Sequence, residues 1–190
     1  MVGLNNPGVE FEGTRHNAGA LAVEILATRL GVEMKRDRAA KCRIAGTHVN
    51  ISGQEADRSV LLAVPLVYMN ASGIAVRSIM RRCALDDFSS LVVVHDEMDI
   101  EPGRVKISVG GGAAGHNGIL SIQAHLHTSD FTRVRIGIGK PRSREAGAGY
   151  VLSRPRGMHR REFNDGVHIA ADALEVILSQ GVEAAMRMYN

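Results

Sequence analysis

The sequence has little sulfur chemistry, because only two cysteines occur among its 190 residues. Cys42 and Cys83 lack the spacing of a metal-binding pair, and each is typical of a small apolar residue in a core. Two cysteines also provide no disulfide framework, which fits a reducing compartment. The sequence therefore disfavours a disulfide-held secreted scaffold and a cysteine-based metal site.

Long hydrophobic runs are missing as well. No apolar stretch approaches the ~18 residues that a membrane-spanning helix needs, and the strand-like residues 2–4 leave no room for a signal peptide. The net charge is only +3, with a pI of about 9.1, which permits an anionic partner without demonstrating one. We expect a cytoplasmic protein that does not engage membranes.

Several familiar catalytic motifs are also absent. No Gly-x-Ser-x-Gly elbow presents a nucleophile, and the glycines at 110–112 lack the Gly-Lys-Ser/Thr ending of a P-loop. Pro7 does not suit the phosphate turn of a dinucleotide site. A cofactor-dependent α/β enzyme is therefore only a third reading, and we expect no cofactor.

Strands and helices alternate along the chain, and no change of composition marks a domain boundary. This pattern predicts one α/β domain over residues 1–190, a mixed twisted β-sheet covered by helices. Residues 140–158 are expected to form a mobile loop or lid, because 141–149 is rich in Gly, Arg and Ser. Strands are expected at 2–4, 41–51, 60–64, 91–94, 105–109 and 133–139, and helices at 17–30, after residue 70, after residue 117 and at 158–188 with a break at Gly181.

Residues 91–118 gather most of the chemical groups. The apolar run 91–94 predicts a buried strand that delivers His95, Asp96, Glu97 and Asp99 at its carboxyl end, where α/β sheets bind ligands. A glycine-rich loop follows, and Asn117 then precedes apolar residues at helical spacing. We expect Asn117 to cap that helix.

Polar residues from other strand ends can reach the same edge of the sheet. His16 lies at a loop-to-helix junction, and Asn6 lies in the turn after the first strand. A histidine backed by a carboxylate such as Asp96 is a general base, and the amide of Asn117 can donate to an oxyanion without adding charge. Water is then the expected nucleophile.

Other readings of these residues stay open. His95, Asp96 and Asp99, supplemented by His116, are compatible with a metal, but their spacing matches no recognisable ligand set. Tyr68 and Met69 are either core or contact residues. The basic residues of the two alternating strands are either solvated or form a patch for phosphates: Arg104, Lys106, Arg133 and Arg135.

Taken together, seven stretches resemble the bacterial-type peptidyl-tRNA hydrolase family, in family order and across nearly the whole chain. They are GLNNPG at 3–8, TRHNAG at 14–19, YMNASG at 68–73, HDEMDIEPG at 95–103, GGGAAGHNG at 110–118, DFTRVRIGIGKP at 130–141 and YVLSR at 150–154. The resemblance implies hydrolysis of the ester that joins a peptide to the terminal ribose of tRNA, which recycles stalled peptidyl-tRNA. It also implies a metal-independent α/β protein that is usually a monomer.

The resemblance implies a role for individual residues. His16 resembles the base that activates water, Asp96 the carboxylate that orients it, and Asn117 the group that stabilises the oxyanion. The remaining residues correspond to positions that hold the peptide, the attacking water or the tRNA: Asn6, Phe11, Met69, Asn70, His116, Lys106 and Arg135.

Four positions depart from the family pattern. Asn5 replaces a usual Gly or Ala, Phe11 replaces a common Tyr, Ser108 replaces a frequent basic residue, and Ala114 replaces a usual Gly. If the backbone at Ala114 needs a positive φ, the change costs ~1 kcal/mol. These departures motivate an alternative, an RNA-binding relative with reduced or lost hydrolase activity.

Overall fold

The computed structural model describes residues 1–49, 58–141, 143 and 145–190. Its strands are β1 (Val2–Gly3), β2 (Lys35–Asp37), β3 (Cys42–Val49), β4 (Arg58–Pro65), β5 (Val92–Glu97), β6 (Val105–Val109) and β7 (Thr132–Gly137). Its α-helices are α1 (Ala18–Arg29), α2 (Ser72–Arg82), α3 (Asn117–Leu126), α4 (Gly147–Val151), α5 (Met158–Gln180) and α6 (Val182–Tyr189). Short 3₁₀ turns are η1 (Val9–Phe11), η2 (Arg15–Asn17), η3 (Met69–Ala71) and η4 (Phe88–Ser90).

The strands form one seven-stranded sheet in the order β2-β3-β4-β1-β5-β7-β6. The central strands β4, β1, β5 and β7 are parallel, whereas β2 and β3 on one side and β6 on the other are antiparallel to their neighbours. The mixed α/β sheet predicted from the sequence is therefore confirmed.

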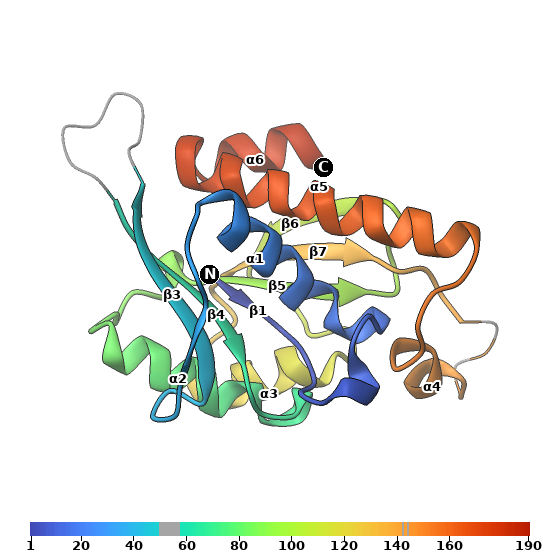
Figure 1. The fold of residues 1–190 in the computed structure, drawn as a ribbon, viewed down its shortest axis with the longest axis horizontal. Helices are drawn as coiled ribbons and strands as arrows, with labels where there is room; N and C mark the ends of the chain where they lie inside the picture. Colours follow the sequence, from blue (N-terminus) through green and yellow to red (C-terminus); the bar gives the residue numbers. More distant parts are fainter. Residues whose placement is uncertain (50–57, 142, 144) are drawn as a thin grey trace.

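Helices cover both faces of the sheet. Helices α1, α5 and α6 lie on one face, and α2 and α3 lie on the other (Figure 1). Val92 and Val94 of β5 belong to the core under α1 and α5, whereas Val93 belongs to the core under α2 and α3. A strand buried on both faces reads as a continuous apolar run, which explains why β5 stands out in the sequence.

Gly19 allows α1 to lie directly against the central strands. A Cβ atom at this position would lie 2.1 Å from the carbonyl oxygen of Val94. The neighbouring Ala20 N–H donates to the carbonyl of Leu4 at 3.1 Å. This close approach places η2, which immediately precedes α1, beside the carboxyl ends of β1 and β5.

Two elements were not expected from the sequence, β2 and α4. Helix α4 lies within the segment 140–158, and the Tyr150 hydroxyl of this helix donates to the carbonyl of Ile138 at 2.5 Å. Part of the segment predicted as a loop is therefore helical. Its mobility stays a prediction, and Arg142 and Arg144 lie outside the described residues, as do residues 50 and 51 of the expected strand 41–51.

The helical region at the end of the chain agrees with the sequence prediction. It is broken at Gly181, whose φ is 89° and which separates α5 from α6. Among the helices that the structure describes, none combines the length and the apolar character needed to cross a bilayer.

Candidate active site

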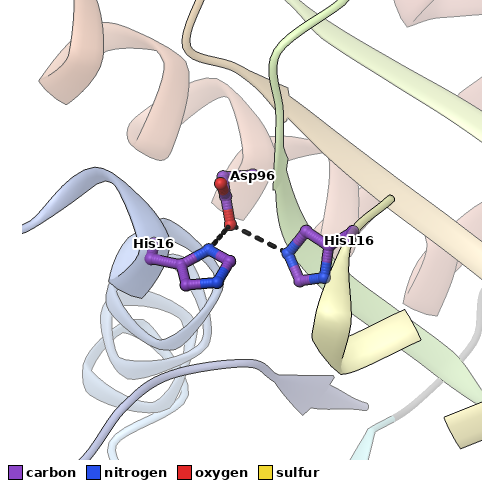
Figure 2. Close-up of side chains that lie close together, drawn as sticks. All are labelled: His16, Asp96 and His116. Carbon is purple, nitrogen blue, oxygen red and sulfur yellow. Dashed lines mark hydrogen bonds and ion pairs between the residues drawn. The ribbon is translucent and has the colours of Figure 1, made fainter. Parts of the chain in front are cut away.

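Asp96 lies at the centre of a buried polar cluster at the carboxyl end of β5. Its side chain is only 1% exposed. The His16 ring reaches it from η2, and the His116 ring reaches it from the residue before α3 (Figure 2). Three segments that are distant in sequence therefore meet at one carboxylate, at the edge of the sheet predicted to hold the site.

His16 and Asp96 form a close pair. The Nδ1 atom of His16 lies 2.8 Å from Oδ1 of Asp96. Because an ionised carboxylate only accepts hydrogen bonds, Nδ1 carries the proton and donates it. This bond leaves Nε2 of His16 with its lone pair, which is the state of the ring that can take a proton from water.

His116 is the second donor to the same oxygen, a contact that sequence reasoning missed. Its Nε2 lies 3.0 Å from Oδ1 of Asp96, and its side chain is only 8% exposed. On the other side of the ring, Nδ1 accepts hydrogen bonds from the backbone N–H groups of Gly118 and Ile119. His116 is therefore the N-cap of α3, and the predicted cap Asn117 is instead the first residue of the helix.

The electrostatics of the cluster keep Asp96 ionised. Burial raises the pKa of Asp96, but the interactions with His116 and His16 together outweigh it and hold the pKa well below its ordinary value. His95 lies on the same strand and is fully buried. Burial lowers the pKa of His95 well below its ordinary value, so His95 is a neutral ring.

Asn6 organises the neighbouring turn. Its side-chain Oδ1 accepts a hydrogen bond from the backbone N–H of Met69 at 2.8 Å. Asn17, which sequence reasoning did not single out, holds the backbone of Asn6 at both ends: its Oδ1 accepts from Asn6 N–H at 2.8 Å, and its Nδ2 donates to Asn6 C=O at 3.0 Å. Asn6 thus links β1 to η3 within the site.

Two exposed amides belong to segments that adjoin Met69. Asn70 follows buried Met69 in η3, and Asn117 follows His116 at the start of α3; both are exposed. The start of α3 packs closely on η3, because a Cβ at Gly118 would lie 2.6 Å from Sδ of Met69. The predicted residues Asn6, Met69, Asn70 and Asn117 therefore belong to adjoining segments.

Phe11 contacts Tyr68, the residue before Met69. Its ring packs edge-on against Tyr68, with ring centroids 6.3 Å apart. Because phenylalanine has no hydroxyl, this position offers an apolar contact surface only. Tyr68 itself is exposed, in contrast to the buried Met69 that follows it.

The basic residues of β6 and β7 divide into two kinds. Lys106 is exposed and lies directly opposite Arg135 in the β6–β7 pair, and Arg135 donates to Oε2 of Glu97 through Nε at 3.2 Å and Nη2 at 3.1 Å. Arg133 was expected to lie on the solvated face or in the phosphate patch, but it is buried and donates to the carbonyls of Gly110 and Gly112. Arg133 therefore fixes the glycine loop that leads to His116.

His16, Asp96 and His116 also have the composition of a metal site, since one ligand atom from each lies within 4.8 Å of the others. However, Oδ1 of Asp96 lies 2.8 and 3.0 Å from the two ring nitrogens, which are hydrogen-bond distances. Nδ1 of His116 is occupied by two backbone donors. The arrangement thus fits a hydrogen-bonded acid–base cluster, and the expected absence of a metal stays a prediction.

The chain is similar to known proteins along its whole length. The sequence profile described as peptidyl-tRNA hydrolase matches residues 1–190. Peptidyl-tRNA hydrolase of Cutibacterium acnes is 40% identical over 194 residues, covering 100% of this chain and 96% of that protein. The protein of the same name from Mycolicibacterium vanbaalenii is 42% identical, covering 97% of this chain and 93% of its own length.

Solved structures show the same likeness. The crystal structure of peptidyl-tRNA hydrolase from Acinetobacter baumannii is 34% identical and superposes with a TM-score of 0.89, covering 100% of this chain and 92% of that one. A peptidyl-tRNA hydrolase in complex with N-propanol is 35% identical, with the same TM-score and the same coverage. With the profile, the sequence relatives and the fold in agreement over its full length, the chain belongs to the peptidyl-tRNA hydrolase family.

Proposed function

We propose that this chain hydrolyses peptidyl-tRNA, the substrate class of its family, with His16 as the general base and Asp96 as its partner. The reaction cleaves the ester between the peptide and the terminal ribose of the tRNA. The observation that carries the assignment is the buried pair of His16 Nδ1 and Asp96 Oδ1, 2.8 Å apart at the carboxyl end of β5.

The reaction follows from the state of the His16 ring. Nε2 takes a proton from water, and the water oxygen attacks the ester carbonyl carbon to give a tetrahedral oxyanion. The imidazolium that forms is stabilised by ionised Asp96. When the intermediate collapses, the C–O bond to the ribose breaks and His16 returns the proton to the leaving ribose oxygen. The products are tRNA with a free hydroxyl and the carboxylic acid of the peptide, which releases its remaining proton to solvent and becomes a carboxylate.

The amides around Met69 are proposed to hold the substrate. The side-chain N–H groups of Asn117 face the developing oxyanion, because a neutral donor stabilises that charge without competing with His16. Asn6 uses its oxygen for the Met69 backbone, and so its Nδ2 remains to contact the peptide or the water. Asn70 and Met69 are proposed to contact the peptide or the attacking water, and Phe11 to supply an apolar contact to the substrate.

Lys106 and Arg135 are proposed to contact tRNA phosphates. They lie side by side on neighbouring strands, but Arg135 is already paired with Glu97. Lys106 is exposed and so offers the less compensated charge of the two. We also propose that the chain works in the cytoplasm as one domain and as a monomer, without a metal or cofactor, with water as the only co-substrate.

The alternative, an RNA-binding relative without hydrolase activity, has no specific observation in its favour. Its motivation was the set of departures at Asn5, Phe11, Ser108 and Ala114. Ala114 does adopt a positive φ of 47°, but the strain affects the glycine loop rather than the His16–Asp96 pair. The departures therefore bear on affinity more than on chemistry.

Release of tRNA from N-acetyl-aminoacyl-tRNA separates the two functions. The proposed hydrolase releases free tRNA with multiple turnovers in buffer without added metal. Tight binding of the same substrate with no release, under conditions in which the protein is folded, would instead identify an RNA-binding relative.

A further inference from the structure

The start of α3 determines where the proton of His116 resides. The backbone N–H groups of Gly118 and Ile119 lie 3.1 and 3.3 Å from Nδ1 of this ring. A ring nitrogen that accepts hydrogen bonds from two N–H groups carries no proton of its own. The proton of the ring is therefore on Nε2, which lies 3.0 Å from Asp96.

We propose that His116 is a positioning residue, held by the N-terminus of α3 as a neutral ring protonated on Nε2, which supports Asp96 with an uncharged donor. Sequence analysis had placed His116 among the substrate-binding residues. Its side chain is only 8% exposed and both of its ring nitrogens are engaged within the protein. The inference rests on the proposed role of His16, because Asp96 matters to turnover only through that base.

Neutrality matters because the His116 ring is close to the base. The ring centroids of His16 and His116 are 4.8 Å apart (Figure 2). His16 gains a positive charge as it takes the proton from water. A second positive ring at about this distance would slow that step roughly 10²–10³-fold at an effective dielectric constant of ~20. A neutral donor avoids this penalty and still satisfies Asp96.

The charges around His116 come from several elements. Asp96 of β5 favours a proton on the ring, whereas a charged His16 of η2 and the positive end of α3 disfavour a positive charge there. His95 of β5 packs edge-on against His116, with centroids 4.8 Å apart, and its Nδ1–H donates to the carbonyl of Asp96 at 2.7 Å. The two backbone donors of α3 decide the outcome, because protonation of Nδ1 would break both bonds.

The three histidines have different roles, and the rings of His16 and His95 each lie against that of His116. His95 is buried and neutral, His116 is engaged at both nitrogens, and His16 keeps one nitrogen that is not bound to the carboxylate. The proton taken from water is thereby directed to His16 alone.

Nitrogen-15 NMR of histidine-labelled wild-type protein tests the inference without any reaction. For His116, we expect the signature of an unprotonated Nδ1 and a protonated Nε2 at the pH of the activity assay. Exposed His159 of α5 provides the internal reference for an accessible ring. A His116 ring that is doubly protonated under these conditions, or protonated on Nδ1, overturns the proposal.

Replacement of His116 by asparagine tests the consequence for turnover. Asparagine still caps a helix, but it is too short to donate to Asp96. We expect kcat for N-acetyl-aminoacyl-tRNA to fall about 10- to 100-fold, the usual effect of removing a group that orients a functional histidine, with KM nearly unchanged. His48→Asn, at an exposed position of β3, is the matched control and keeps wild-type kcat.

The outcomes separate this inference from the proposed function. A raised KM with unchanged kcat for His116→Asn would make His116 a substrate contact and refute the positioning role, while leaving hydrolysis intact. If the wild-type protein released no tRNA, the proposed function would be refuted. The NMR measurement would still determine which nitrogen of His116 is protonated.

Discussion

Replacing Asp96 by asparagine isolates the charge of the carboxylate from its shape. The two side chains have nearly the same size, and the asparagine oxygen can still accept hydrogen bonds from His16 and His116. The imidazolium that forms at His16 in the transition state then loses a negative partner. At ~4 Å and an effective dielectric constant of ~20, one such charge pair contributes about 4 kcal/mol, which corresponds to a roughly 10³-fold lower kcat.

The assay is steady-state release of tRNA from N-acetyl-aminoacyl-tRNA, with kcat and KM determined separately. Asp172→Asn is the control, because Asp172 of α5 also pairs with a basic residue, Arg29, at 2.7 Å, but on the exposed surface. Surface ion pairs contribute little, so this variant keeps wild-type kcat. A kcat for Asp96→Asn within tenfold of the wild-type value, in a folded protein, would refute the electrostatic reasoning.

Three further predictions concern other parts of the site. Asn117→Ala lowers kcat about 10²–10³-fold, as expected for loss of one oxyanion donor; an unchanged kcat in the same release assay excludes that role. Ala114→Gly relieves a positive φ of 47° and raises the free energy of unfolding in urea by about 0.5–1 kcal/mol, whereas Ala146→Gly, at φ −75°, lowers it by a similar amount; equal effects contradict the strain argument. Because burial holds the pKa of His95 well below 6.5, the folded state binds fewer protons than the unfolded state below that pH. Wild-type stability therefore falls with acidification, by up to about 1.4 kcal/mol per pH unit from this group. His95→Gln shows a smaller fall between pH 7 and pH 5, and an identical fall contradicts this prediction.

The regular elements could be predicted because their patterns are local. The apolar run of β5, the alternation in β6 and the helical spacing after Asn17 each record which faces are buried, and the structure forms the corresponding elements. Strand β2, by contrast, consists of three polar residues at the edge of the sheet, and α4 is a short helix with two glycines, held by Tyr150. Neither carries a periodic signal.

The site was predictable only to the level of its segments. Because parallel strands end at the same edge of the sheet, the sequence predicted that His16 and Asp96 lie together, and the structure places them in contact. The N-cap of α3, however, was predicted to be Asn117 and is His116. Both residues are compatible with a helix start, and only the tertiary contact with Asp96 fixes the orientation of the His116 ring. Arg133 was predicted to face solvent or phosphates and is instead buried. The sequence could not show this, because its hydrogen-bond partners Gly110 and Gly112 are more than twenty residues away.

Replacement of His16 by alanine tests the central claim most directly, namely that an imidazole backed by Asp96 draws the proton from the attacking water. The measurement is single-turnover release of tRNA from N-acetyl-aminoacyl-tRNA at saturating protein, with tRNA affinity and thermal unfolding recorded on the same variant. We predict that release is abolished while affinity and folding stay close to wild type. Wild-type release by a folded His16→Ala protein would contradict the mechanism.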